Sequence, residues 1–182
     1  MRKIILDLAV SLDGFIEGPN GEIDWCIMDD DMGFDNFLSE IDTIFYGRVS
    51  YDLWGQFHPD STATLIERQI WDEVHSKKKY VFSRNPQTNN EATYISTDIA
   101  SQVREIKSQA GKNIWLYGGA NLITTFLDLG LIDVYRLGVH PVILGTGKPI
   151  FSNIPKRVNL TLKEVKSFKS GVTLLSYEHS EK

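Results

Sequence analysis

The chain has 182 residues, a length that suits one compact α/β domain and is short for two. Its composition, 42% hydrophobic and 24% charged, is that of a globular protein with a substantial core. The formal net charge of −5 argues against a surface for nucleic acid or for an anionic membrane, because such surfaces gather Lys and Arg. We expect a single domain over residues 1–182 that binds neither.

Cysteine and histidine usage narrows the compartment and the chemistry. Cys26 is the only cysteine, so no internal disulfide can form, and a reducing cytoplasm is the expected compartment. The four histidines are scattered and lack the spacing of a metal motif, so we predict no metal site. No apolar run has the length of a membrane-spanning helix.

Strands and helices alternate in the first two thirds of the chain. Strands are predicted over 3–10, 42–46, 79–82 and 114–117, each followed by turn residues. Helices are predicted at about 33–40, 49–55, 63–76, 98–109 and 120–129, with Asp98 as an N-cap. Strands near 133–140, 158–166 and 171–178 close the chain. The expected fold is α/β, with a mixed, mostly parallel sheet and antiparallel C-terminal strands.

Three of these strands end in residues suited to a phosphate ligand. The loops that follow them are Gly47-Arg48-Val49-Ser50, Ser83-Arg84 and Gly118-Gly119-Ala120-Asn121. Ligands of open α/β sheets bind beyond the carboxyl ends of the strands, so the loops are expected to meet. Glycine lets the backbone approach phosphate, helix N-termini offer free N–H groups, and arginine suits a phosphate monoester. Each motif alone is also typical of a tight turn, but their recurrence favours NADP over NAD.

A fourth glycine-containing segment does not carry this chemistry. Gly145-Thr146-Gly147-Lys148 lacks the P-loop pattern, because Val142 stands where a glycine is required and Pro149 where Ser or Thr is required. We predict a structural loop between strands.

Four segments of the chain occur in the order found in the dihydrofolate reductase superfamily, which the chain resembles. They are Ala9–Ile16, Phe45–Tyr51, Tyr80–Arg84 and Trp115–Ala120. Ser11-Leu12-Asp13-Gly14 and His140–Gly147 resemble the branch that includes the C-terminal reductase domain of the bifunctional riboflavin-biosynthesis deaminase/reductase. The resemblance spans residues 3–152. It implies a three-layer α/β/α fold, NADPH as the hydride donor and, commonly, a homodimer.

The resemblance also assigns residues to the cofactor. Those expected at the NADPH phosphates are Gly47, Arg48, Ser50, Ser83, Arg84, Gly118, Gly119 and Ala120. Those expected to line the nicotinamide ring are Ala9 and Ile16.

For the substrate, the resemblance implies a carboxylate five residues after a tryptophan, followed by an aromatic residue. Trp25, Asp30 and Phe34 match these positions, and Asp30 is then the candidate catalytic acid. A carboxylic acid in a partly apolar cleft has a raised pKa and can help to deliver a proton. The run Asp29-Asp30-Asp31 is equally typical of a solvated loop before a helix, which leaves the choice among the three open.

The expected function is the NADPH-dependent reduction of a C=N bond in a pterin-like or aminopyrimidine substrate. The phosphoribosylaminouracil reductase step of riboflavin biosynthesis is the first alternative. In that branch an arginine usually precedes the strand at 42–46, whereas residues 37–42 here include two acids and no base. A non-catalytic NADP-binding protein is the second alternative.

Overall fold

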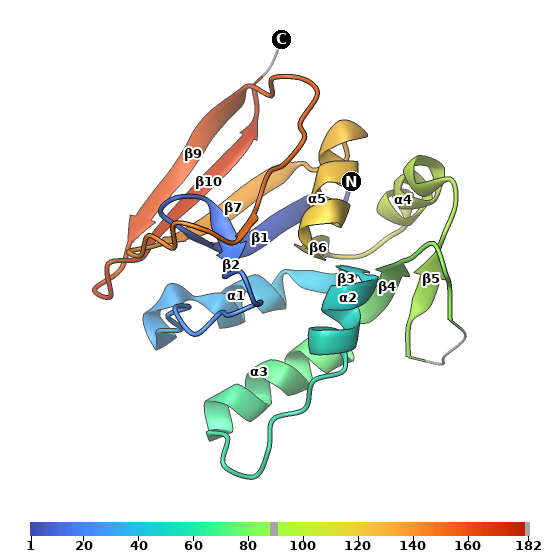
Figure 1. Ribbon diagram of the computed structural model, residues 1–182. Helices are drawn as coiled ribbons and strands as arrows, with labels where there is room; N and C mark the ends of the chain where they lie inside the picture. Colours follow the sequence, from blue (N-terminus) through green and yellow to red (C-terminus); the bar gives the residue numbers. More distant parts are fainter. Residues whose placement is uncertain (88–90, 181–182) are drawn as a thin grey trace. The chain divides into compact units, whose positions relative to one another are not determined.

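The computed structural model describes residues 1–87 and 91–180, apart from the side chain of Asp30. The chain forms two compact units (Figure 1). Unit 1 consists of Met1–Arg2 and Gly33–Gly119, and unit 2 of Lys3–Met32 and Ala120–Lys182. The expectation of one domain over residues 1–182 stays a prediction.

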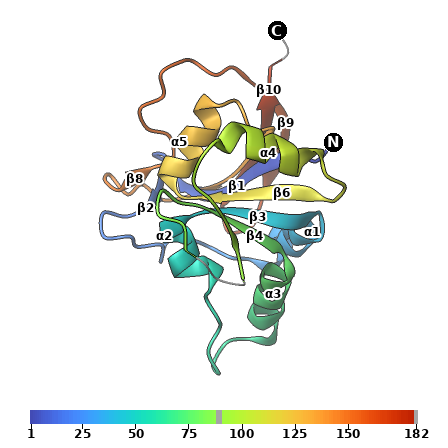
Figure 2. The ribbon, with the colours of Figure 1, turned by 90° about the vertical axis from the view of Figure 1, so that its right-hand side faces the viewer.

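Unit 1 is a parallel sheet with helices on both faces. Its strands lie side by side in the order β5-β4-β3-β6 and all pair in parallel. They are β3 (Ile41–Gly47), β4 (Lys78–Phe82), β5 (Thr93–Ile95) and β6 (Asn113–Gly118). Figure 2 shows α4 on one face of these strands and α1, α2 and α3 on the other. These helices are α1 (Phe34–Ser39), α2 (Arg48–Ser50), α3 (Leu65–Ser76) and α4 (Ile99–Ser108), and α2 continues into a π-helical turn, η2 (Tyr51–Gly55).

The central strand of unit 1 shows why the sequence folds this way. Ile44, Phe45 and Tyr46 are consecutive residues of β3 and all three are fully buried. A strand that is covered on both faces needs a continuous apolar run rather than an alternating one. The run in β3 therefore requires the helices that cover it.

Unit 2 is a mixed sheet in the order β1-β7-β10-β9. β1 pairs with β7 in parallel, and the pairs β7–β10 and β10–β9 are antiparallel. These strands are β1 (Ile4–Ser11), β7 (Val134–His140), β9 (Leu160–Ser167) and β10 (Thr173–His179). A separate two-stranded ribbon pairs β2 (Phe15–Glu17) with β8 (Lys148–Pro149), and the remaining elements are η1 (Asp30–Met32) and α5 (Ala120–Asp128).

The predicted fold class is confirmed: the fold is mixed α/β with a large, mostly parallel sheet and antiparallel C-terminal strands. Asp98 lies at the N-cap position of α4, as predicted, but its side chain makes no capping hydrogen bond. Asp98 has φ 45° and ψ 46°, whereas a capping side chain reaches the helix from an extended backbone conformation.

No helix in the described residues has the length and hydropathy that a membrane span requires.

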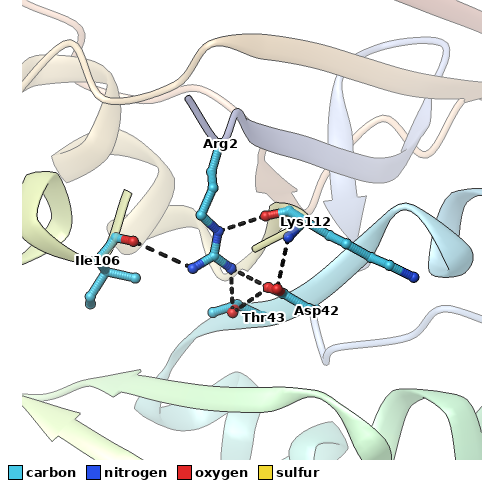
Figure 3. Close-up of polar contacts among 5 residues, drawn as sticks. All are labelled: Arg2, Asp42, Thr43, Ile106 and Lys112. Carbon is cyan, nitrogen blue, oxygen red and sulfur yellow. Dashed lines mark hydrogen bonds and ion pairs between the residues drawn. The ribbon is translucent and has the colours of Figure 1, made fainter. Parts of the chain in front are cut away.

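Arg2 connects the start of the chain to the amino ends of β3 and β6 through hydrogen bonds and an ion pair (Figure 3). Its guanidinium donates to the Thr43 hydroxyl at 2.6 Å, to the carbonyl of Lys112 at 2.6 Å and to the carbonyl of Ile106 at 3.4 Å. It also forms an ion pair with Asp42. Only 6% of Arg2 is exposed, so these partners replace the water that the guanidinium loses on folding.

Candidate cofactor and substrate sites

The loops predicted to hold phosphates begin at one edge of unit 1. In the parallel ladders Gly47 is the partner of Phe82, and Tyr46 is the partner of Gly118. β3, β4 and β6 therefore end side by side. The loops Arg48–Ser50, Ser83-Arg84 and Gly118-Gly119 all start at this carboxyl edge.

Two of these loops approach each other closely at their glycines. A Cβ atom on Gly47 would lie 3.3 Å from both the Gly118 carbonyl oxygen and the Gly119 nitrogen. A Cβ atom on Gly119 would lie 3.2 Å from the Ser50 hydroxyl oxygen. Gly118 has φ 109°, which L side chains rarely adopt, and the peptide bond between Gly118 and Gly119 is cis. The backbone of these glycines therefore packs closely together beside the Ser50 hydroxyl, with Gly118 buried and with Gly47 and Gly119 half-buried.

Two arginines stand at the same edge. The Arg48 side chain is 47% exposed and forms an ion pair of 2.5 Å with Asp52, one helical turn further on. Such an exposed pair contributes only about 0.3–0.5 kcal/mol, so a phosphate that accepts several hydrogen bonds can displace Asp52. Arg84 is exposed. The hydroxyl of Ser83 donates to the Asn85 carbonyl at 2.9 Å and accepts the Asn85 N–H at 3.1 Å.

Buried tyrosines lie next to these loops in the chain. Tyr46 and Tyr51 are fully buried, with ring centroids 5.7 Å apart, and the Tyr117 ring lies 4.9 Å from that of Tyr46. Burial, together with the neighbouring tyrosines, raises the pKa of the Tyr46 hydroxyl well above its usual value. Tyr46 therefore stays neutral and acts as packing at this edge rather than as an acid or base.

Three residues expected at the cofactor belong to unit 2. Ala9 lies in β1, half-buried, opposite Gly138 of β7. Ile16 is the half-buried middle residue of β2. Ala120 is the buried first residue of α5.

Asp13 closes the turn after β1 in a way that sequence reasoning missed. Its carboxylate accepts the Ser11 hydroxyl at 2.7 Å and the N–H groups of Leu144 and Gly145 at 3.1 and 2.7 Å. Desolvation raises the pKa of Asp13, but these hydrogen bonds outweigh it and hold the pKa below its usual value. The carboxylate thus joins the turn after β1 to the loop after β7, where the predicted structural loop lies.

The predicted substrate residues fall in both units. In unit 2, Trp25 is half-buried and its indole N–H donates to the Glu22 carbonyl at 3.2 Å. The backbone of Asp30 opens η1, and its side chain lies outside the described part of the chain. In unit 1, Phe34 begins α1, and its ring centroid lies 5.6 Å from that of Trp115.

The other polar side chains between residues 26 and 31 that the structure describes are exposed or unreactive. Asp29 and Asp31 are exposed. Burial, and secondarily the charge of Asp24, raises the pKa of the Cys26 thiol to about 11, so the thiol stays protonated. Among the described side chains, no three of His, Cys, Asp or Glu gather as metal ligands would.

Comparison with known proteins identifies the family. The family model described as the RibD C-terminal domain matches residues 2–174. The uncharacterized protein YyaP of Bacillus subtilis (strain 168) is 56% identical over 177 residues, which are 97% of this chain and 94% of that protein.

Solved structures share the fold. A putative riboflavin biosynthesis protein from Shewanella sp. PV-4 has a TM-score of 0.80 at 21% identity, with both chains fully covered. A Thermotoga maritima diaminohydroxyphosphoribosylaminopyrimidine deaminase/5-amino-6-(5-phosphoribosylamino)uracil reductase has a TM-score of 0.68 at 17% identity, covering 98% of this chain and 57% of that one. With a family model that spans nearly its whole length, the chain belongs to the RibD C-terminal domain family.

Proposed function

We propose that this protein is an NADPH-dependent reductase that acts on a C=N bond of a pterin-like or aminopyrimidine substrate. The observation that carries the proposal is the close approach of Gly47 to Gly118 and Gly119, with Ser50 and Arg48 at the same edge. Membership in the RibD C-terminal domain family supports it.

The residues at this edge fit a dinucleotide with an additional phosphate. We assign Gly47, Gly118 and Gly119 to the pyrophosphate, because a glycine backbone, which has no Cβ atom, can approach a phosphate closely. The Ser50 hydroxyl can donate to the same group. Arg48 and Arg84 are exposed cations suited to the phosphate monoester that distinguishes NADPH from NADH.

When bound, NADPH supplies the hydride, and the chain contributes orientation and a proton. We assign Ala9 and Ile16 to the surroundings of the nicotinamide ring, and Trp25 and Phe34 to packing on the flat substrate. We assign the proton to the Asp30 carboxyl or to a water molecule beside it. The reaction then needs no covalent intermediate on the protein.

Replacement of the three aspartates one at a time tests this assignment. Asp30→Asn is expected to lower turnover and leave NADPH affinity unchanged, while the matched controls Asp29→Asn and Asp31→Asn leave turnover unchanged. The assay is the loss of NADPH absorbance in the presence of each candidate substrate. Unchanged turnover in Asp30→Asn would remove Asp30 from the proposal, and a loss in a control would move the role to that residue.

A second candidate is the reduction of the phosphoribosylaminouracil of riboflavin biosynthesis. The family and the name of the Thermotoga protein favour it. The stretch Phe37–Asp42 opposes it, because Glu40 and Asp42 are its only charged residues and a phosphoribosyl group calls for a cation. Turnover of this compound above that of every pterin would establish the second candidate over the first.

We expect weak or no activity on dihydrofolate itself, and turnover of that substrate on the order of 10 per second would contradict this expectation. NADPH binding without oxidation by any C=N compound would favour a non-catalytic NADP-binding protein. We also propose a cytoplasmic location, from the single cysteine, and a homodimer, from the family resemblance.

A further inference from the structure

His140 is the last residue of β7, and its side chain contacts residues 22–27, the segment that contains Trp25, at two places. Its ring is buried, with 4% of the residue exposed. Its Nδ1 accepts the backbone N–H of Ile27 at 3.3 Å. The Trp25 ring meets it edge-on, with centroids 5.4 Å apart and planes at 80°. One side chain of the sheet therefore contacts both the backbone and the aromatic ring of this segment.

The other hydrogen bonds that the structure gives residues 22–27 are local. The N–H of Cys26 donates to the Ile23 carbonyl at 3.0 Å, and the indole of Trp25 donates to the Glu22 carbonyl at 3.2 Å. Such bonds shape the segment without fixing it to the sheet. The contact with His140 is what ties the segment to the carboxyl end of β7.

The hydrogen bond also selects one form of the imidazole. Because the Ile27 amide donates, Nδ1 must carry a lone pair, and the neutral ring then has its proton on Nε2. Desolvation lowers the pKa of His140, which favours the neutral form. Burial and hydrogen bonding thus support the same tautomer.

We propose that His140 is a positioning residue, which holds Trp25 and the following acidic run in the arrangement that binds substrate. The inference rests on the proposed function, because it assigns Trp25 to the substrate. A segment that is already fixed before binding loses little entropy when the substrate arrives. The variants proposed below replace none of the residues assigned to the NADPH phosphates, so we expect the NADPH Kd to stay unchanged.

Two variants separate the acceptor from the bulk of the side chain. His140→Leu keeps a buried side chain but has no acceptor for the Ile27 N–H. His140→Asn, of similar size, carries an amide oxygen that can take the place of Nδ1. We expect His140→Leu to speed hydrogen exchange of the Ile27 amide and to raise the substrate KM, each about tenfold, with the NADPH Kd unchanged. His140→Asn should restore part of both, a rescue that a merely structural role would not give.

The exchange measurement does not depend on activity. Wild-type exchange of the Ile27 amide in His140→Leu would overturn the inference, whatever the protein catalyses. Faster exchange with unchanged KM and kcat would overturn it as well. If His140→Leu does not fold, Ile27→Pro removes the donor and leaves His140 in place, and the same rise in KM is expected. Faster exchange in a protein that reduces no C=N compound would overturn the proposed function, and the substrate role of His140 with it.

Discussion

Replacing Arg2 with methionine removes the guanidinium and keeps most of the aliphatic stem, so the change isolates the polar contacts. Arg2 is 6% exposed and donates to Thr43, Lys112 and Ile106 besides its ion pair with Asp42. Removing one partner of a buried ion pair costs about 3–5 kcal/mol of unfolding free energy.

The cost for Arg2→Met falls at the lower end of this range. The Asp42 side chain is 36% exposed, so water can reach it, and its carboxylate still accepts the Lys112 N–H at 2.8 Å and the Thr43 hydroxyl at 2.7 Å. We therefore expect a loss of about 3 kcal/mol. With a urea m-value of about 2 kcal/mol/M, the unfolding midpoint falls by about 1.5 M.

The adjacent residue provides a matched control. Lys3 is 54% exposed at its side chain and pairs with Glu178 at 2.6 Å. An exposed pair contributes about 0–1 kcal/mol, so Lys3→Met should move the urea midpoint by less than about 0.5 M. Urea unfolding of both variants is monitored by circular dichroism. Equal midpoints for Arg2→Met and Lys3→Met would refute the claim that the buried Arg2 contacts stabilise the fold more than the exposed Lys3 pair does.

Three further predictions concern the cofactor edge, a buried carboxyl and a helix start. In calorimetry, Arg48→Ala should weaken NADPH binding about tenfold or more and NADH binding much less. The control Arg68→Ala, on α3, should leave the affinity for both dinucleotides unchanged. Equal weakening of both by Arg48→Ala would assign Arg48 to the pyrophosphate that they share. Burial raises the pKa of Asp7 to about 6, although the charge of Arg136 opposes the shift, against about 3.9 in the unfolded chain. The folded state therefore binds the proton more tightly, and it loses about 2 kcal/mol of unfolding free energy as the pH rises from 4 to 6. The urea midpoint of Asp7→Asn should not fall with pH in this way. A pH dependence equal to that of the wild type would contradict the raised pKa of Asp7. Thr64→Ala removes the acceptor for the Glu67 N–H and should cost about 1 kcal/mol by urea unfolding, which an unchanged midpoint would disprove.

Long strands were predictable because their apolar runs are bounded by turn residues. β3 (Ile41–Gly47) and β6 (Asn113–Gly118) each extend one residue beyond the predicted range at both ends. β2, β5 and β8 have only two or three residues, too few for a hydrophobic pattern of their own. They form because a neighbouring strand offers a partner, which composition along the chain does not show.

Some residues of the candidate site were likewise predictable from the sequence, and others were not. Glycines after a strand are a local signal, so Gly47, Gly118 and Gly119 could be singled out from the sequence. The contacts of Asp13 with Leu144 and of Ile27 with His140 join residues that are 131 and 113 positions apart. No spacing rule connects such pairs. The parallel pairing of β1 with β7 brings Asp13 near Leu144, and the chain after β2 folds back to bring Ile27 to His140.

Calorimetric titration of the purified protein with NADPH and with NADH tests the proposed cofactor site. We expect micromolar binding of NADPH and binding of NADH at least about tenfold weaker, because Arg48 and Arg84 favour the additional phosphate. No binding of either dinucleotide, or equal binding of both, would contradict it.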